Sequence, residues 1–170
     1  MLCSNFEIET RRLLLRELVP GDAPFMLALL NERSVVRYIG DRGVRTLEAA
    51  RKHVEDGPMA SYKKYGFGLY QVVLKEKDTP VGTCGLLQRD TMEHPDLGYA
   101  MLPDHRSKGY ATEAAAAVVE HARNVLGLER IIALTSPDNL WSIELLSKLG
   151  FEFEKKVEFC GESSLYAINL

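Results

Sequence analysis

The segment HRSKGYATEA at residues 105–114 places two cations and a glycine at the start of a predicted helix. The first turn of a helix carries backbone N–H groups without partners, and the helix dipole makes that end positive, so main chain alone can bind an anion there. Gly109 allows a sharp turn and a close approach of the backbone, while Arg106 and Lys108 add charge. The pattern predicts a phosphate-binding loop. Two solvated cations before an ordinary helix are the alternative that charge and spacing leave open.

Several other kinds of site are not predicted by the remaining patterns. The pattern G-x-x-x-x-G-K-[ST] is absent, and the GFG at residues 66–68 lacks the third glycine of a dinucleotide fingerprint. The four histidines form neither H-x-x-x-H nor H-E-x-x-H, so we expect no metal site. The formal net charge is −3 and the cations are scattered, which argues against a nucleic-acid partner.

The cysteines and the N-terminal segment bear on where the chain acts. Cys3, Cys84 and Cys160 are odd in number and form no C-x-x-C pair, which favours a reducing cytoplasm. Charged residues interrupt the apolar run near the N-terminus, so we expect neither a signal peptide nor a membrane span. We therefore expect a cytoplasmic protein without a membrane partner.

The elements that position the loop follow from hydrophobic periodicity and turn residues. Seven strands are predicted, at residues 12–18, 67–76, 81–88, 96–102, 130–136, 151–159 and 164–170. Four helices are predicted, at residues 22–32, 46–66 with a break at Gly57–Pro58, 109–126 and 139–149. This order predicts a single α/β (α+β) domain over residues 1–170, with a mixed sheet and helices on both faces.

Three segments, in this order, resemble motifs of the GNAT N-acetyltransferase superfamily. RSKGYATEA is similar to the family's pyrophosphate loop, Q/R-x-x-G-x-G/A, with Arg106, Gly109 and Ala111 in the fixed positions. DLGYAMLPDHRSKGYATEA resembles the acidic-x-Gly-Tyr strand that leads into that loop, and SPDNLWSIELLSKLGF resembles the second motif. The N-terminal TRRLLLREL and GDAPFMLALLNE resemble the branch of ribosomal-protein N-terminal (Rim-type) acetyltransferases.

The resemblance implies acetyl-coenzyme A as the donor and a V-shaped, mostly antiparallel sheet. The strands GYAML and IIALTS would run parallel and splay apart, with the pantetheine arm between them. A bulge at Met101 and Leu102 would leave main-chain groups free for that arm. The pyrophosphate would lie on the amides of the loop, whose residues are Arg106, Ser107, Lys108, Gly109, Tyr110 and Ala111.

Three polar residues receive catalytic roles from the same resemblance. Asp96, two residues before Gly98, is the candidate base, and the alternative is a solvated carboxylate at a strand end. Asn139 would contact the cofactor arm, or only cap the following helix. Ser142 would protonate the leaving sulfur, or only assist the cap, because the tyrosine acid of many family members is replaced by Leu146.

The acceptor is the least constrained part of the prediction. An α-amino group has a pKa of roughly 8 and a lysine of roughly 10.4, so a weak base suffices for a protein N-terminus, which is the preferred acceptor. A small amine remains an alternative, and so does a non-catalytic acyl-coenzyme A binder or an unrelated phosphate-binding α/β protein. A polyamine would need converging carboxylates, for which Asp41, Glu48, Glu55 and Asp56 are the candidates. Trp141 packs beside the cofactor helix or at a subunit contact, and the chain acts as a monomer or homodimer.

Overall fold

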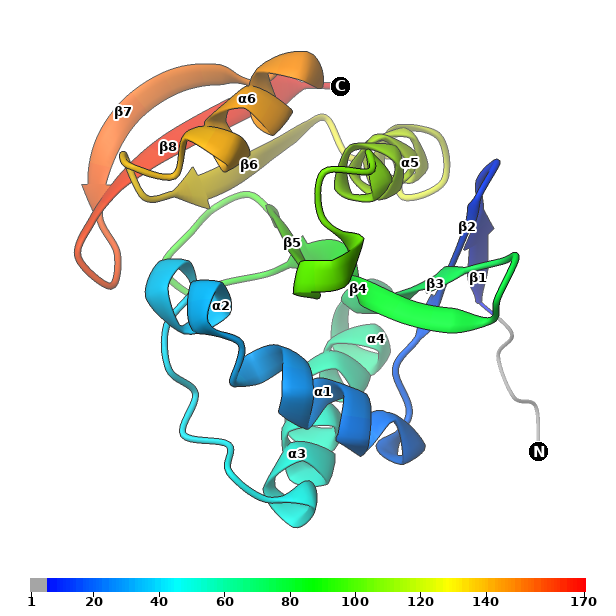
Figure 1. Ribbon diagram of the computed structural model, residues 1–170. Coiled ribbons are helices and arrows are strands. Elements are labelled where there is room, and N and C mark those ends of the chain that lie inside the picture. The colour runs from blue at the N-terminus through cyan, green and yellow to red at the C-terminus, as the bar shows by residue number, and fades with distance from the viewer. Residues whose placement is uncertain (1–5) are drawn as a thin grey trace.

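The computed structural model describes residues 6–170 and contains one eight-stranded sheet (Figure 1). The predicted α/β class is confirmed. The strands are β1 (Glu7–Glu9), β2 (Leu13–Glu17), β3 (Leu69–Leu74), β4 (Thr79–Leu87), β5 (Asp96–Met101), β6 (Arg130–Thr135), β7 (Glu152–Glu158) and β8 (Glu162–Asn169). They lie in the order β1-β2-β3-β4-β5-β6-β8-β7. The prediction of seven strands is short by β1, which has three residues and only one apolar side chain. Cys3 lies outside the described residues.

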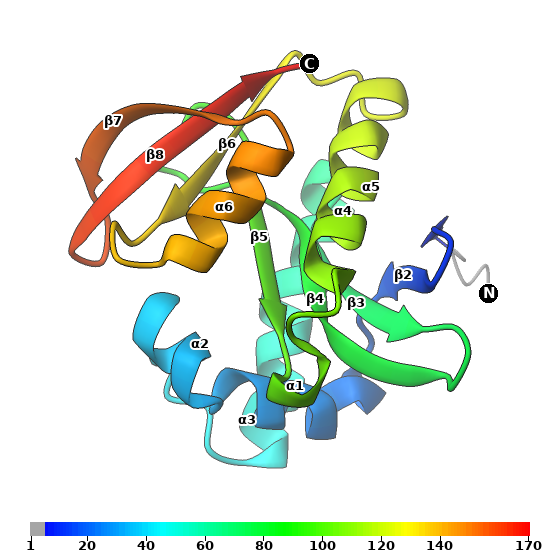
Figure 2. The same cartoon turned by 45° about the horizontal axis from the view of Figure 1, so that its top comes forward.

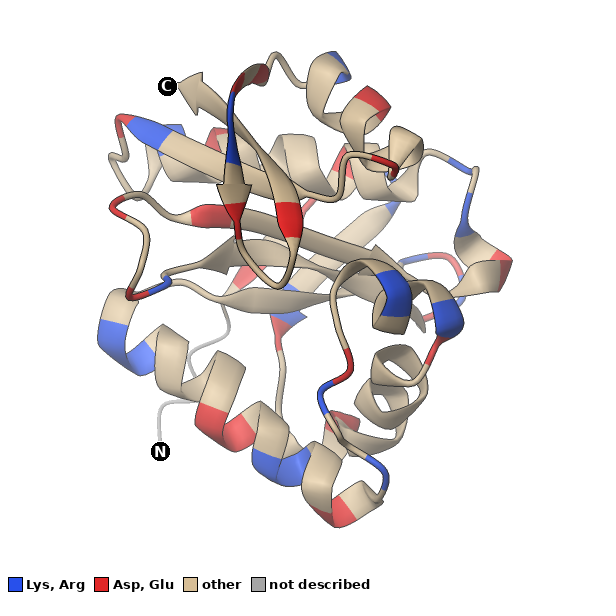
Figure 3. Ribbon diagram, turned by 90° about the vertical axis from the view of Figure 1, so that its left-hand side faces the viewer, with Lys and Arg blue, Asp and Glu red and all other residues tan. Residues whose placement is uncertain are grey.

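The helices cover both faces of the sheet, as expected. One face carries α5 (Tyr110–Asn124) and α6 (Leu140–Lys148), and the other carries α1, α3 and α4, with α2 beside α1 (Figures 1 and 2). The bounds of these four are α1 (Ala23–Leu30), α2 (Arg33–Tyr38), α3 (Leu47–Val54) and α4 (Ala60–Tyr65). Figure 3 shows positive and negative residues interspersed along the helices in view.

Two predictions about the helices are wrong. The chain does not break at Gly57–Pro58, because a π-helical turn at Glu55–Met59 continues α3 into α4 and accommodates a proline that has no N–H to donate. Helix α2 lies in a stretch where no element is predicted. It has only six residues, and its N-cap is Glu32 rather than one of the usual Ser, Thr, Asp or Asn.

Two hydrophobic cores lie on opposite faces of the sheet. Strand β5 contributes to each of them, because its residues alternate between the two faces. Leu97 and Met101 are buried in the larger core, which includes residues of α5 and α6. Ala100 is buried in the second core, with residues of α1 and α3. The same alternation places Tyr99 on the α5–α6 face, where it packs against the larger core, and Asp96 on the α1–α4 face.

The only parallel neighbours in the described sheet, β5 and β6, separate almost at once. Asp96 opposite Ile132 is their single register pair, and the Ile132 N–H donates to the Pro95 carbonyl at 2.9 Å. Beyond that pair the two strands diverge, and α6 lies on the side of the opening (Figure 2). This is the V-splayed sheet that the sequence resemblance implies.

Candidate active site

The loop between β5 and α5 has a backbone shaped for an anion. A 3-10 turn at Pro103–His105 follows β5, and Ser107 and Gly109 then take left-handed conformations, with φ of +59° and +81°. Because α5 begins at Tyr110, the N–H groups of its first turn lack partners in the preceding turn. The loop therefore points a cluster of amides toward one side, at the positive end of a fifteen-residue helix.

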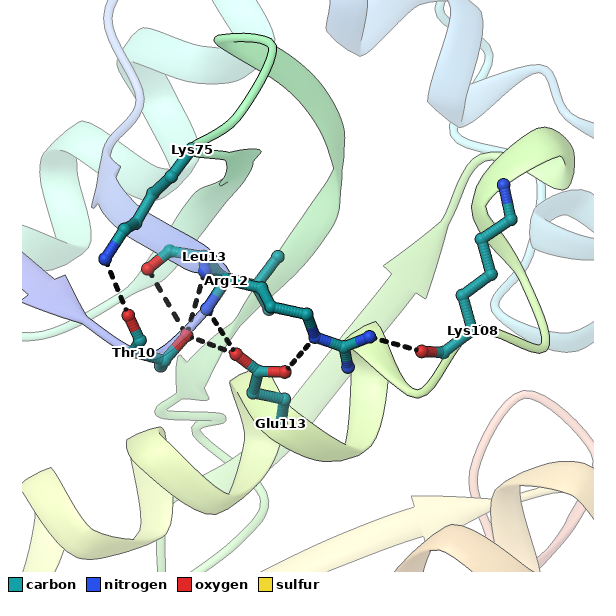
Figure 4. A network of polar contacts seen from close by, with 6 residues as sticks. All are labelled: Thr10, Arg12, Leu13, Lys75, Lys108 and Glu113. Carbon is teal, nitrogen blue, oxygen red and sulfur yellow. Dashed lines mark hydrogen bonds and ion pairs between the residues drawn. The ribbon is translucent and has the colours of Figure 1, made fainter.

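Arg12, the residue before β2, joins this loop to the start of that strand (Figure 4). Its guanidinium donates to the Lys108 carbonyl at 2.9 Å and to the Glu113 carboxylate at 2.6 Å, and it lies 4.7 Å from the centre of the Tyr110 ring. The Thr10 hydroxyl donates to the same carboxylate at 2.6 Å. Glu113 lies in the first turn of α5, where its charge would repel an anion, and Arg12 neutralises it.

Gly109 is the one residue of the loop where a side chain is excluded by both conformation and space. Its positive φ is strained for any residue with a Cβ. A Cβ built there would lie 3.2 Å from a terminal nitrogen of Arg12. A side chain at position 109 would therefore be strained and would displace the Arg12 guanidinium.

Arg106 is engaged by the protein itself, which narrows the predicted run of free amides. Its N–H donates to the Pro103 carbonyl at 3.2 Å. Its guanidinium donates to the Met101 carbonyl at 3.0 and 3.1 Å, and to the Glu32 carboxylate and the Ser34 hydroxyl at 2.6 Å each. Burial acts to raise the pKa of Glu32, but hydrogen bonds from Ser34 and Arg106 outweigh it and lower that pKa to about 2. The free amides begin after Arg106, whose side chain joins the loop to the start of α2.

The end of β5 differs from the expected bulge. The register with β4 is unbroken from Leu87 opposite Asp96 to Gly82 opposite Met101, so the bulge predicted at Met101 and Leu102 is wrong. Both backbone groups of Leu102 are used, since its N–H donates to the Val81 carbonyl at 2.9 Å and its carbonyl accepts from the His105 N–H at 3.0 Å.

Met101 supplies one of the backbone groups that the bulge was expected to leave unpaired with the protein, its N–H. The bond from Leu102 to Val81 makes Met101 and Gly82 a non-hydrogen-bonded pair. The N–H and carbonyl of Met101 therefore point away from β4, toward the side where β6 has diverged. Arg106 takes the carbonyl, and the N–H faces the opening.

A pocket of about 240 Å³ lies between this loop and α6. Its wall on one side is formed by the loop and the first turn of α5, and Met101 contributes to it. The opposite wall includes Trp141 and Leu145 of α6. Trp141 is 44 % exposed and meets the ring of Tyr99 on β5 edge-on.

Asp96 is buried at the vertex of the V. Its carboxylate is 2 % exposed, accepts from the Arg89 guanidinium at 2.8 Å and from the Leu134 N–H at 3.3 Å, and so spans the two diverging strands. Arg89 itself lies 4.5 Å from the centre of the Phe159 ring. The alternative of a solvated carboxylate is wrong. Burial raises the pKa of Asp96 to about 6, although the ion pair with Arg89 acts to lower it.

Asn139 and Ser142 lie at the start of α6. The Asn139 side-chain oxygen accepts from the Ser142 N–H at 3.3 Å, which is the capping role that was left open. The Ser142 hydroxyl is 2.6 Å from the hydroxyl of Tyr99, a residue that the sequence prediction missed. The available signal was period-two alternation, because Tyr99 lies two residues before Met101 and so shares its face. Leu146 is fully buried.

A family model described as an acetyltransferase (GNAT) domain matches residues 12–152 of the chain. The chain belongs to the GNAT acetyltransferase family. An N-acetyltransferase of Bacillus subtilis strain 168, YoaA, which is named as uncharacterized, is 32 % identical over 149 residues and covers 86 % of this chain and 83 % of its own length. The GNAT domain and this relative indicate that the chain is an N-acetyltransferase.

Solved GNAT structures share the fold over nearly the whole chain. An acetyltransferase of the GNAT family from Bacillus anthracis has a TM-score of 0.81 at 26 % identity, covering 96 % of this chain and 98 % of its own. RimL, a ribosomal L7/L12 α-N-protein acetyltransferase solved with coenzyme A, has a TM-score of 0.85 at 16 % identity, covering 97 % and 98 %. At that identity the likeness to RimL shows the fold alone. Within residues 6–170, no helix has the length and apolar character needed to cross a membrane.

Proposed function

We propose that this GNAT enzyme transfers an acetyl group from acetyl-coenzyme A to the N-terminal α-amine of a protein or peptide. The observation that carries the donor is the left-handed, amide-rich loop at Ser107 to Gly109, which opens into the pocket beside α6. That RimL, with the same fold, was solved with coenzyme A supports the choice.

The residues that would hold the donor follow from the free groups at the site. The diphosphate would lie on the amides of residues 107–111 at the positive end of α5. The amide group of the Asn139 side chain would hold the pantetheine arm, and the Met101 N–H would meet the thioester carbonyl at the end of that arm. Acetyl-coenzyme A supplies a thioester carbon for attack by the amine and a thiolate that leaves.

The base and the hydrogen-bond donor to the sulfur fall on opposite faces of β5. Asp96, on the α1–α4 face, takes a proton from the acceptor ammonium, directly or through water. Ser142, near the α5–α6 face, donates a hydrogen bond to the departing sulfur, which leaves as a thiolate and takes its proton from solvent. The Met101 N–H, pointing into the opening between the strands, would donate to the oxygen that becomes negatively charged.

The acceptor class is proposed from the basicity of Asp96. A carboxylate whose pKa is about 6 is a weak base. It matches an α-amine with a pKa of roughly 8 better than a lysine of roughly 10.4.

A polyamine acceptor is disfavoured by the ion pairs of two candidate carboxylates. Asp41 is bound to Arg45 and Asp56 to Lys52, each at 2.6 Å. Carboxylates that already have cationic partners on their own segment are poor recognition groups for a second cation. RimL, whose name gives a protein α-amine as its acceptor, supports the same ranking.

The experiment measures free thiol released from acetyl-coenzyme A in the presence of an amine panel. The panel pairs peptides that have a free N-terminus with the same peptides blocked at that position, and adds lysine-only peptides, polyamines and aminoglycosides. We expect turnover on free N-termini that disappears on blocking. Turnover confined to small amines would overturn the acceptor, and donor binding without turnover on any amine would favour a non-catalytic acyl-coenzyme A binder.

We further propose that the chain acts as one domain over residues 1–170, as a monomer or homodimer, in the cytoplasm. Within the described residues Cys84 and Cys160 are unpaired, Cys84 buried and Cys160 exposed, which suits a reducing compartment. Light scattering after size-exclusion chromatography measures the oligomeric state.

A further inference from the structure

Two hydroxyl groups meet behind the pocket, one from a strand and one from a helix. The Tyr99 hydroxyl of β5 is 2.6 Å from the Ser142 hydroxyl of α6, and it lies 3.4 Å from the Ser142 carbonyl. Ser142 is 5 % exposed, and Tyr99 is half-buried. The pair bridges the elements that form the two walls of the V on the α5–α6 side.

The neighbours of both residues line the pocket. Met101, two residues after Tyr99 and on the same face, contributes to its wall, and so do Trp141 and Leu145, which flank Ser142 along α6. Trp141 also meets the Tyr99 ring at 5.7 Å between centroids and an angle of 76°. The hydroxyl pair therefore lies next to the pocket, on the side toward the vertex of the V.

The hydrogen atoms of this pair can be arranged in two ways, because each hydroxyl has one hydrogen to donate. In the first arrangement Tyr99 donates to Ser142, and the Ser142 hydrogen is available for a third group. In the second, Ser142 donates to Tyr99 and the Tyr99 hydrogen turns to the Ser142 carbonyl. The second closes a ring in which one bond is 3.4 Å long, at the weak limit for an O–H donor.

We propose that Tyr99 is a positioning residue, which donates to the Ser142 oxygen and so directs the Ser142 hydrogen toward the sulfur of the donor. This inference rests on the proposed function. Tyr99 does not touch the reacting atoms in this arrangement. The departing sulfur leaves as a thiolate that accepts a hydrogen bond from the Ser142 hydroxyl, which keeps its hydrogen, and Tyr99 fixes the direction in which that hydrogen points.

The Tyr99 hydroxyl has a hydrogen to donate at neutral pH. Burial raises the pKa of Tyr99, against the hydrogen bond with Ser142 that acts to lower it, so the phenol keeps its hydrogen throughout the neutral range. Leu146, one turn further along α6, has no hydroxyl and cannot supply the same bond. Because Tyr99 comes from the strand and Ser142 from the helix, the contact also fixes the position of α6 beside β5.

The test titrates the thiol of bound coenzyme A by the ultraviolet absorbance of its thiolate. A hydrogen-bond donor near the sulfur stabilises the thiolate and lowers the thiol pKa. The proteins are wild type, Tyr99→Phe, Ser142→Ala, the double variant and Ser142→Thr, with calorimetric affinity for coenzyme A measured for each. Tyr166→Phe is the matched control, because Tyr166 also makes an edge-on ring contact, with Phe153 at 5.7 Å, but lies on β8.

We expect Tyr99→Phe, Ser142→Ala and the double variant to raise the bound thiol pKa by the same amount. That amount is a roughly three- to tenfold fall in the thiolate-to-thiol ratio at a fixed pH. Ser142→Thr should retain the wild-type value, and so should Tyr166→Phe. Affinity for coenzyme A should change by less than about threefold in all of them, since the hydroxyl pair makes at most one hydrogen bond to the ligand.

Three outcomes overturn parts of the scheme separately. A wild-type protein that does not bind coenzyme A overturns the proposed function. Binding with an unchanged thiol pKa in Tyr99→Phe overturns the role of Tyr99, and if Ser142→Ala alone shifts it, Ser142 donates to the sulfur without being directed by Tyr99. No shift in either variant is the result expected of the closed ring. If Tyr99→Phe does not fold, a fluorotyrosine placed at position 99 replaces it. The fluorinated phenol is a stronger donor and should lower the thiol pKa, and no change would contradict the inference.

Discussion

The two faces of β5 hold polar groups of different kinds. On the α1–α4 side Asp96 is a buried charge, and it is accompanied by the Arg89 guanidinium and a backbone N–H from β6. On the α5–α6 side Tyr99 and Ser142 are a neutral pair that needs no counter-ion. Burying an isolated charge costs far more than burying a hydrogen-bonded hydroxyl. The buried charge of Asp96 is therefore paired with a cation, whereas the Tyr99 and Ser142 hydroxyls need only each other.

The polar groups on the two faces also differ in the proton chemistry that they allow. A carboxylate whose pKa is about 6 can accept a proton near neutral pH, and a hydroxyl pair can only donate or orient one. Alternation along β5 places Asp96 and Tyr99 on opposite faces, so under the proposed roles the acceptor and the donor would approach from different sides of the sheet. The following variants alter one face or the connection between them.

The largest effect is expected from Asp96→Asn, which removes the proposed base on the α1–α4 face. We expect kcat to fall by about 10²-fold, with affinity for coenzyme A unchanged. In the wild type kcat/KM should rise as pH passes about 6, because Asp96 must lose its proton before it can accept one. The pH–rate profile of the variant should lack that limb and keep the limb of the amine itself.

The matched control for this change is Asp90→Asn, since Asp90 is an exposed carboxylate on the same β4–β5 connection. Its profile should match the wild type. If Asp96→Asn retained the limb near pH 6, Asp96 would not be the base, and its role would be to bridge β5 and β6.

Gly109→Val alters the loop between β5 and α5, where the diphosphate is proposed to bind. A β-branched side chain at φ +81° is strained, and its Cβ would crowd the Arg12 guanidinium. We expect affinity for coenzyme A to fall at least roughly tenfold, about 1.4 kcal/mol, as measured by calorimetry. Gly127→Val is the control, because Gly127 also has a positive φ, +64°, but has nothing within 4 Å of its Cβ position and lies outside the loop.

Both glycine variants should lose similar stability in thermal melts, because both strain a left-handed residue. Only Gly109→Val should lose affinity for coenzyme A. Equal affinities in the two variants would show that the loop does not bind the diphosphate.

A smaller effect is expected from Arg12→Ala, which leaves the Glu113 carboxylate unneutralised at the start of α5. We expect coenzyme A affinity to fall roughly three- to tenfold, more at low salt than at high salt, since exposed charges are screened. The double variant Arg12→Ala/Glu113→Gln should recover part of the loss. Arg11→Ala changes an exposed neighbour and should bind as the wild type does. Failure of the double variant to recover would mean that Arg12 acts by packing on Tyr110 rather than by charge.

The loop between β5 and α5 could be predicted from the sequence because its signals are local. Gly109, the following helical periodicity and the flanking cations lie within a few residues of one another, and the resemblance placed them in a family. The strand pattern likewise predicted all but the three-residue β1. An unpaired backbone group at Met101 was expected for the wrong reason, because strand divergence, and not a bulge, leaves its N–H without a strand partner.

The partners of the catalytic candidates could not be predicted, because they come from distant segments. Asp96 meets Leu134 only where β5 and β6 diverge, and Tyr99 meets Ser142 only when α6 packs beside β5. The side chain of Arg106 was expected to add charge for the ligand, but it binds Glu32 and Ser34, which are more than seventy positions away in the chain. Local sequence patterns carry no information about which distant residues will come into contact.

The smallest effect is expected from Glu32→Gln, at the connection between the loop and the acceptor-side helices. Glu32 accepts from Arg106 and caps α2, so its loss should lower stability by about 1.5–3 kcal/mol at neutral pH, the value of a hydrogen bond to a charged group. The folded-state pKa of about 2 is below the ordinary 4.5, so the contribution is complete above pH 4.5 and is lost as pH falls from 4.5 toward 2. Chemical denaturation of wild type and variant should therefore converge over that interval. Glu48→Gln, an exposed carboxylate in the first turn of α3, is the control, and a difference in stability that stayed constant down to pH 2 would show that the charge of Glu32 is not what joins the two regions.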